Sequence, residues 1–185
     1  IKEKKDGKYL ILKADTEYSA PEIEFRELNG VAFSQLRNTI KINQNTLLKK
    51  VVTKKKEIPV DAVRDLIISS ITLKYTQSNS VGFALDGQMI GIGAGQQSRI
   101  DCTKLAGRKA ETWYLSQHPK VRKLPFLENM TSLERTNARI LFIEGGMTDK
   151  ELQNWQRLFD SPVEPLTQEE KRNWLSNLKG VSLSS

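Results

Sequence analysis

The side chains best suited to chemistry in this sequence lie within residues 74–110. Hydroxyl and amide groups fill residues 76–80, and a glycine-rich stretch then leads to two glutamines, a serine and Arg99. The amide of Asn79 can donate and accept hydrogen bonds at once, and Arg99 adds a forked cationic donor. Groups of this kind favour a polar or anionic ligand. The alternative interpretation is that Asn79 only stabilises a turn.

A hairpin and a helix are predicted to position these groups. Residues 81–85 and 88–92 have the pattern of two strands, and Asp86-Gly87 between them supplies the positive φ angles of a tight turn. A helix is then expected, because five residues recur at helical spacing. They are Ile100, Thr103, Ala106, Ala110 and Trp113.

Three glycines, Gly91, Gly93 and Gly95, lie at the end of the second strand and in the bend that leads to this helix. Glycine permits a sharp bend and a close approach of the backbone to a ligand, so we expect the helix start to face a glycine-lined hollow. Free N–H groups at a helix start favour an anion there. A purely structural turn is the alternative, since the spacing fits neither the Walker phosphate loop nor the dinucleotide fingerprint.

Before the hairpin, residues 9–13 and 23–28 are predicted as strands at the edge of a sheet, and residues 30–42 as strand or irregular chain. Pro59 is predicted to open a helix that runs toward Lys74, with Pro59 near the first turn, where its missing N–H is not needed. The stripe of this helix that should pack on a sheet consists of Val60, Val63, Leu66, Ile67 and Ile71.

Three capping boxes predict where later helices begin, because a threonine hydroxyl and a glutamate three residues on satisfy free amides reciprocally. The pairs are Thr131 with Glu134, Thr148 with Glu151, and Thr167 with Glu170. Gly145-Gly146 separates the first two of these helices, and Pro162 and Pro165 separate the last two. Trp155, Leu158 and Phe159 are expected to face a core.

The net charge and the number of cysteines limit the class of protein. The 185 residues carry a net charge of +7, which points to anionic partners. A lysine run contributes much of this charge, and we interpret residues 49–56 as a solvated connector. Cys102 is the only cysteine, so an intramolecular disulfide is excluded and a reducing compartment is expected. No apolar run approaches the roughly 20 residues of a membrane helix, and a cytosolic protein is predicted.

Four stretches between residues 51 and 185 resemble one enzyme family. The central two are KYTQSNSV and IGIGAGQQSRIDCTKLAG, flanked by VVTKKKEIPVDAVRDLIISSITL upstream and LTQEEKRNWLSNLKGVSLSS near the end. They resemble the formyltransferase domain of the AICAR transformylase/IMP cyclohydrolase family. The chain is thereby expected to be part of that domain.

The resemblance implies an α/β fold, a cytidine-deaminase-like mixed sheet with flanking helices. Residues 1–58 would be the end of a first lobe and a connector, and residues 59–185 a second lobe and the helices that follow. The zinc site of true deaminases is not expected, because their His-x-Glu and Pro-Cys-x-x-Cys signatures are missing. One histidine and one cysteine cannot complete such a site.

In function, the resemblance implies transfer of a formyl group from 10-formyltetrahydrofolate to the 5-amino group of AICAR in purine (IMP) biosynthesis. Asn79 and Arg99 would contact the AICAR nucleotide, with Arg99 at the phosphate or the carboxamide, and Ile100 would lie beside the folate. The family's catalytic Lys-His pair lies before the matched stretch. No catalytic residue is therefore assigned here, and this chain alone should turn over little or no AICAR. The family's active sites lie between two subunits, so a homodimer is expected.

Three interpretations stay open at this point. Thr76, Ser78 and Ser80 could hold a monovalent cation or could cap backbone groups. His118, the only histidine, does not match the catalytic position and is interpreted as a helix-end residue. A basic α/β module that binds nucleotides or RNA without catalysis is the alternative function. Against RNA, the tryptophans fall on helix stripes rather than on an exposed strand platform.

Overall fold

The structure, a computed structural model, describes residue 8 and residues 10–185. The chain divides into two compact units, residues 1–41 and 42–185. Each unit is described by itself below.

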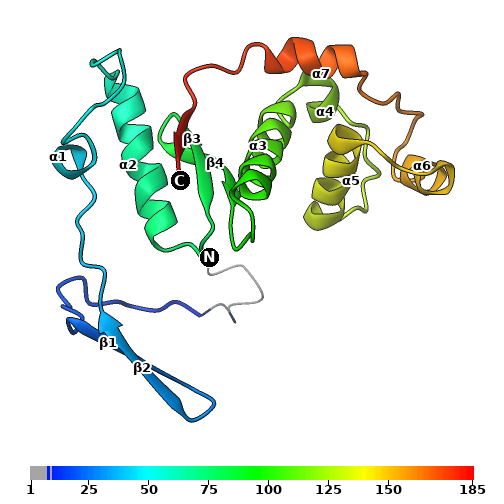
Figure 1. Cartoon of the computed structure of the whole chain (residues 1–185). Helices are drawn as coiled ribbons and strands as arrows, with labels where there is room; N and C mark the ends of the chain where they lie inside the picture. Colours follow the sequence, from blue (N-terminus) through cyan, green and yellow to red (C-terminus); the bar gives the residue numbers. More distant parts are fainter. Residues whose placement is uncertain (1–7, 9) are drawn as a thin grey trace. The chain divides into compact units, whose positions relative to one another are not determined.

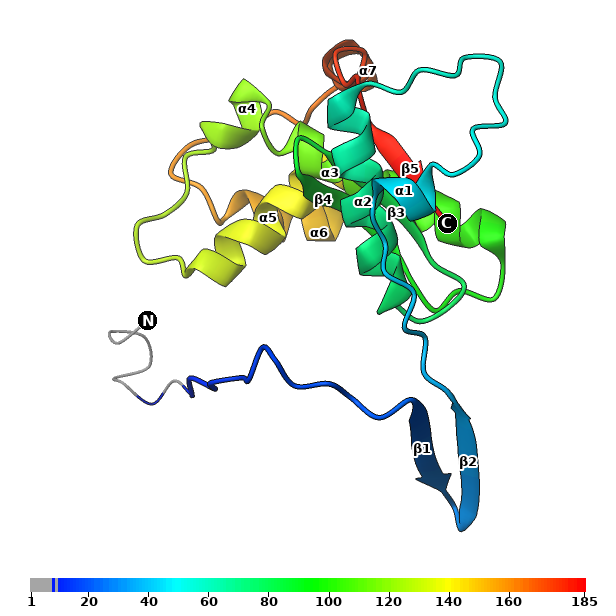
Figure 2. The same cartoon turned by 90° about the vertical axis from the view of Figure 1, so that its left-hand side faces the viewer.

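The first unit contains an antiparallel hairpin of β1 (Ile23–Leu28) and β2 (Val31–Leu36), shown in Figure 2. Asn29 and Gly30 form its turn with φ angles of 52° and 79°, as a tight hairpin requires. Residues 23–28 are confirmed as a strand, and residues 30–42 are partly strand and partly irregular. The strand predicted at residues 9–13 is wrong for residues 10–13, which are irregular, and Tyr9 lies outside the described residues.

The second unit is built on a three-stranded antiparallel sheet in the order β4-β3-β5. Its strands are β3 (Val81–Leu85), β4 (Gln88–Gly93) and β5 (Ser182–Ser184). Helix α2 (Val60–Lys74) covers one face and α3 (Arg99–Leu115) covers the other (Figure 1). The predicted hairpin and both helices are therefore confirmed.

The turn of this hairpin is held by a buried carboxylate. Asp86 and Gly87 have φ angles of 49° and 80°, and both of their amides donate to Asp65 of α2, at 3.0 and 2.8 Å. Arg64 Nε donates to the same carboxylate at 2.9 Å. Burial of Asp65 raises its pKa, but the hydrogen bonds from Arg64, Gly87 and Asp86 outweigh burial and hold that pKa below its ordinary value.

The α2 stripe predicted to pack on the sheet is wrong at its two ends. Val60 is 85% exposed and Ile71 is 42% exposed, whereas Val63 is buried as expected. The fully buried positions of α2 also include Asp65 and Ser69, whose side chains bond to the hairpin turn and to the Gly82 carbonyl. Hydrogen-bonding partners on the sheet, rather than apolar spacing alone, therefore determine which face of α2 is buried.

The glycines of β4 have a different role from the one predicted. A Cβ atom at Gly91 would overlap the Ala106 carbonyl of α3, and one at Gly93 would overlap the Cys102 carbonyl. The prediction that these two glycines allow close approach to a ligand is therefore wrong. They allow the α3 backbone to lie directly on the sheet.

Four further helices follow α3: α4 (Pro119–Arg122), α5 (Ser132–Glu144), α6 (Asp149–Gln156) and α7 (Gln168–Leu175). All three predicted capping boxes are present, at the starts of α5, α6 and α7. The capping box of α7 also contacts α4. Lys120 forms an ion pair with Glu170, and this bond, with the Thr167 amide, lowers the pKa of Glu170 to about 2.

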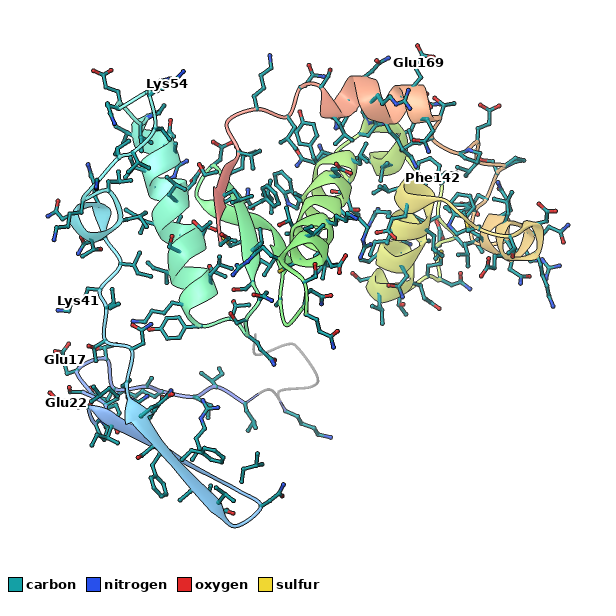
Figure 3. All side chains as sticks on the ribbon, in the orientation of Figure 1. Glu17, Glu22, Lys41, Lys54, Phe142 and Glu169 are labelled. Atoms are coloured by element: carbon teal, nitrogen blue, oxygen red, sulfur yellow. The ribbon has the colours of Figure 1, made fainter. Side chains whose placement is uncertain are left out.

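A large apolar core joins these helices to the end of α3. Trp155 and Phe142 stack with centroids 5.7 Å apart, and Trp155 meets Phe159 edge to face at 4.5 Å; Figure 3 labels Phe142 on α5. Trp155, Leu158 and Phe159 were predicted to face a core. Trp155 and Phe159 are buried, and Leu158 is partly buried against the same core. The buried members are Leu115, Val121, Leu124, Ala138, Phe142, Ile143, Trp155, Phe159 and Leu166.

Three elements were not predicted: the short helices α1 (Gln44–Leu47) and α4, and strand β5. The predicted α/β class is confirmed, but the two sheets of the described residues are antiparallel and not mixed. The lysines of residues 49–56 are exposed on an irregular segment, where Figure 3 labels Lys54. Within the described part of the chain, no helix is long and apolar enough to cross a bilayer.

Candidate functional site

The candidate site lies where the chain enters β3 and where it leaves β4 for α3. Gly95, whose φ of +63° lets the chain turn, donates its amide to the Gln77 carbonyl at 2.9 Å. Asn79 and Gln96 exchange two backbone hydrogen bonds, of 3.3 and 3.4 Å. The polar run before the hairpin and the glutamines after it, far apart in sequence, therefore lie side by side.

Asn79 is held at this junction by both its side chain and its backbone. Its Nδ2 donates to the carbonyls of Gln96 and Gln97, at 3.0 and 3.2 Å. The thiol of Cys102, buried in α3, donates to the Asn79 carbonyl at 3.2 Å. Its Oδ1 accepts no hydrogen bond from any residue that the structure describes. The amide is thus fixed in orientation, with an acceptor left for a ligand.

Arg99 is the first residue of α3 and reaches the same junction. Its Nη1 donates to the carbonyl of Ser80, the residue after Asn79, at 3.2 Å. Ser98 caps the helix by accepting from the Asp101 amide at 3.3 Å. The remaining N–H groups of the exposed guanidinium can bond a ligand. The structure therefore brings Asn79 and Arg99 together.

The third predicted contact, Ile100, follows Arg99 on α3 and is 68% exposed. Five cavities of about 280 to 520 Å³ in the second unit are lined by other residues. Asn79, Arg99 and Ile100 therefore lie outside these five cavities.

The hydroxyl run before β3 is used at least in part for capping. Thr76 Oγ1 donates to the Thr72 carbonyl at the end of α2, at 2.7 Å. Ser80 is buried and offers its carbonyl to Arg99, whereas Ser78 is exposed. Among the described residues, no group of three histidine, cysteine or acidic side chains could hold a metal ion.

His118 was interpreted as the end of the helix that is α3, but α3 ends at Leu115, and His118 begins the next helix. It is the N-cap of α4, where its Nδ1 accepts from the Lys120 amide at 3.2 Å, and its ring meets Trp174 edge to face at 4.9 Å. The three tryptophans, Trp113, Trp155 and Trp174, all lie on helices and are half-buried or buried. These rings do not form the exposed platform that single-stranded RNA requires.

Sequence reasoning missed two features of the site. The Cys102 thiol supports the Asn79 backbone, whereas the sequence indicated only that Cys102 forms no intramolecular disulfide. Gln96 and Gln97 serve through their main-chain carbonyls, and Gln96 Nε2 turns back to the Ala94 carbonyl at 3.0 Å. A local sequence signal for either feature is lacking, because both depend on the pairing of residues 77–80 with residues 95–97.

Comparison with known proteins assigns the chain to a family. The model of the AICARFT/IMPCHase bienzyme family matches residues 1–109, a stretch that contains Asn79, Arg99 and Ile100. The chain belongs to this family. The match ends inside α3, so the model does not extend to α4–α7.

Bacterial relatives include the bifunctional purine biosynthesis protein PurH of Roseobacter denitrificans, 30% identical over 162 residues, which are 80% of this chain and 30% of that protein. PurH of Paracoccus denitrificans is 33% identical over 147 residues, or 72% of this chain and 27% of that protein. PurH of Cereibacter sphaeroides is 35% identical over 109 residues, 58% of this chain and 20% of that protein. The chain therefore spans less than a third of the length of these relatives.

Proposed function

We propose that this chain carries the substrate-binding part of an AICAR transformylase. It would bind the AICAR nucleotide for transfer of a formyl group from 10-formyltetrahydrofolate in purine biosynthesis. The observation that carries the proposal is that both side chains bond main-chain carbonyls of one junction, Asn79 that of Gln96 and Arg99 that of Ser80, in a chain of the AICARFT/IMPCHase family. The cytidine-deaminase-like lobe, the homodimer and the cytosolic location are further parts of this proposal.

The reaction explains why a fixed amide would be useful. The 5-amino group of AICAR is a weak nucleophile, because its lone pair is delocalised toward the neighbouring carboxamide, so catalysis requires that the substrate be oriented. Asn79 Nδ2 is already bound to the Gln96 and Gln97 carbonyls. Its Oδ1 then accepts an N–H of the substrate and holds the carboxamide in the rotation that leaves the amine free to attack.

Arg99 and Ile100 would complete the contacts. The Arg99 guanidinium, steadied by the Ser80 carbonyl, donates to the phosphate or to the carboxamide oxygen, both of which accept charge-assisted hydrogen bonds. Ile100 offers its exposed apolar side chain to the folate. The resemblance assigns proton removal to a Lys-His pair outside the matched motifs. Substrate binding and turnover by this chain are consequently separate questions.

Calorimetric titration with AICAR monophosphate tests the proposal. Each of Asn79→Ala and Arg99→Ala should weaken binding about tenfold or more, as expected for loss of a hydrogen bond to a polar ligand. Asn137→Ala and Lys104→Ala change exposed residues elsewhere on α5 and α3 and serve as matched controls. Titration with the AICAR nucleoside separates the two roles of Arg99, because a phosphate contact predicts that Arg99→Ala leaves nucleoside binding unchanged.

Two outcomes would overturn the assignment. One is the absence of nucleotide binding by the folded chain. The other is RNA binding that weakens steeply with salt, together with AICAR binding that is indifferent to Asn79→Ala, which would favour the nucleic-acid module. A formyl-transfer assay on the same material then tests turnover, and light scattering tests the dimer.

A further inference from the structure

A hollow lined by cationic and apolar side chains lies away from the candidate site, between α3, α4 and α5. Its volume is about 520 Å³, which is within the range of small-molecule sites. Three cationic side chains line it, one from each helix: Lys109, Arg122 and Arg139. The other lining residues are hydroxyl, aromatic or aliphatic, and none is acidic: Thr112, Trp113, Ser116, Thr136, Ile140 and Ile143.

The charge of this hollow is not neutralised within the part of the chain that the structure describes. Other cations of the second unit have carboxylate partners, such as Arg108 with Glu144 and Lys120 with Glu170. Neither Lys109, Arg122 nor Arg139 has a carboxylate oxygen within 4.0 Å among the described residues. Three positive charges that share one concave surface favour an anion of more than one charge.

Two of the three cations are already held in place. Lys109 Nζ donates to the Ile92 carbonyl at 2.9 Å, and the Arg139 guanidinium lies 5.0 Å from the centre of the Phe126 ring. Fixed donors lose less conformational freedom when a ligand binds. The half-buried indole of Trp113 and the side chain of Ile140, which is 39% exposed, add apolar surface beside them.

We propose that this hollow binds a small molecule that carries a phosphate monoester on a planar ring. A phosphate carries about −1.5 to −2 charge near neutral pH and has three acceptor oxygens, which suits three cationic donors that arrive from three helices. The ring would lie on the apolar surface of Trp113 and Ile140. Arg122, which is exposed at the end of α4, supplies the third cationic donor to the phosphate.

This hollow is separate from the candidate site. Lys109 stands ten residues after Arg99 on α3, a distance of about 15 Å along a helix that rises 1.5 Å per residue. The hollow contains none of Asn79, Arg99 or Ile100. Binding there therefore does not depend on the function proposed above.

The competing explanation is that these cations only stabilise the fold. Lys109 lies in the C-terminal half of α3 and Arg122 ends α4, where positive charge stabilises the partial negative charge of a helix end. That explanation predicts a lower melting temperature on neutralising these residues and no ligand effect. Ligand affinity, measured beside stability, separates the two.

The experiment is NMR of the whole chain labelled with ¹⁵N-tryptophan, titrated with AMP, adenosine or inorganic phosphate. AMP should shift the Trp113 indole resonance, assigned with Trp113→Phe, and leave that of the buried Trp155 in place. Adenosine and phosphate, which each lack one half of the proposed ligand, should bind at least about tenfold more weakly than AMP. A lack of Trp113 response to AMP, or equal affinity for AMP and adenosine, would overturn the proposal.

Charge variants sharpen the assignment. Lys109→Gln and Arg122→Gln should each weaken AMP binding about tenfold or more, as expected for loss of a charged hydrogen bond. Lys104→Gln, also on α3, and Arg157→Gln after α6 are exposed controls that should change it less than about twofold. Equal losses in the controls, or disappearance of the Trp113 shift in Asn79→Ala, would place AMP elsewhere and refute the second site.

Discussion

The sheet layer of the second unit and the helices that follow it bury different kinds of groups. Between α2, the sheet and α3 the apolar cluster is small, with Val81, Cys102 and Ala106 as its buried members, and Asp65, Ser69 and Ser182 are buried as polar groups. The helical part is built instead around stacked aromatic rings. One region relies on close backbone approach and hydrogen bonds, and the other on side-chain bulk.

This difference bears on function. Asn79 and Arg99 are oriented by main-chain carbonyls of the sheet layer, so small displacements of that backbone should alter the candidate site. The helical part can lose or gain side-chain volume without moving those carbonyls directly. Added atoms should therefore harm the sheet layer most, and removed atoms the helical part.

The largest expected effect is the loss of Trp155 from the helical core. Trp155→Ala removes a ring that stacks on Phe142 and donates to the Ala138 carbonyl at 3.0 Å, so unfolding free energy should fall by about 4 kcal/mol. Urea unfolding measures this. Trp113→Ala, which truncates a half-buried ring, is the matched control and should cost clearly less. Equal costs would contradict the central role of the aromatic core.

A methyl group added at Gly93 should be nearly as harmful in the sheet layer. Its Cβ would overlap the Cys102 carbonyl of α3, and we expect Gly93→Ala to lower the unfolding free energy by about 3 kcal/mol through overpacking. Binding at the candidate site should weaken as well, because Cys102 bonds to Asn79.

Gly107 provides the control for this change. It lies within α3, and a Cβ there meets no atom within 4 Å. Gly107→Ala should raise the unfolding free energy by about 0.5 to 1 kcal/mol, because alanine is the better helix former. A neutral Gly93→Ala would show that α3 does not lie as closely on the sheet as described.

Asp65 gives the third expected effect. Asp65→Asn turns one acceptor into an amide donor facing the Asp86 and Gly87 amides, which should cost about 2 kcal/mol. The folded-state pKa of Asp65 is lowered, so its stabilisation is present above the unfolded pKa, near 3.9, and is lost as pH falls through the folded pKa. Melting temperature should thus fall less in Asp65→Asn than in the original chain between pH 5 and pH 2.

Asn137→Asp is the control for this pH dependence. Asn137 is exposed on α5 and its substitution adds a solvated carboxylate, so it should leave the acid profile nearly unchanged. An unaltered acid profile in Asp65→Asn would contradict the assigned role of the carboxylate.

The sequence predicted the elements whose signals are local. Asp86-Gly87 located the second hairpin, and the threonine and glutamate pairs located the starts of three helices, because turns and caps depend on neighbouring residues. Asn29-Gly30 carries the same hairpin signal as Asp86-Gly87 and was not used, although it marks the turn of β1 and β2. That omission was avoidable.

Other features could not be predicted from local pattern. Strand β5 contains two serines in three residues, so neither its alternation nor its composition distinguishes it from a loop. The burial of Asp65 and Ser69 depends on hydrogen bonds to residues of the hairpin. For the candidate site, the residue types indicated a polar ligand, and the resemblance to the family identified Asn79 and Arg99 as the residues that would contact it. Their orientation depends on a pairing between segments about 17 residues apart in sequence.

The smallest effect concerns a single helix cap of the helical part. Thr131 is the N-cap of α5, where its hydroxyl accepts from the Glu134 amide at 3.3 Å, and Thr131→Ala should cost about 1 kcal/mol. Thr136, also exposed, lies inside the same helix, and Thr136→Ala should be neutral or slightly stabilising because alanine has the higher helix propensity. Denaturant unfolding compares the pair. Since the two changes remove the same atoms from one helix, equal effects would mean that α5 is stabilised by its buried face alone and not by its cap.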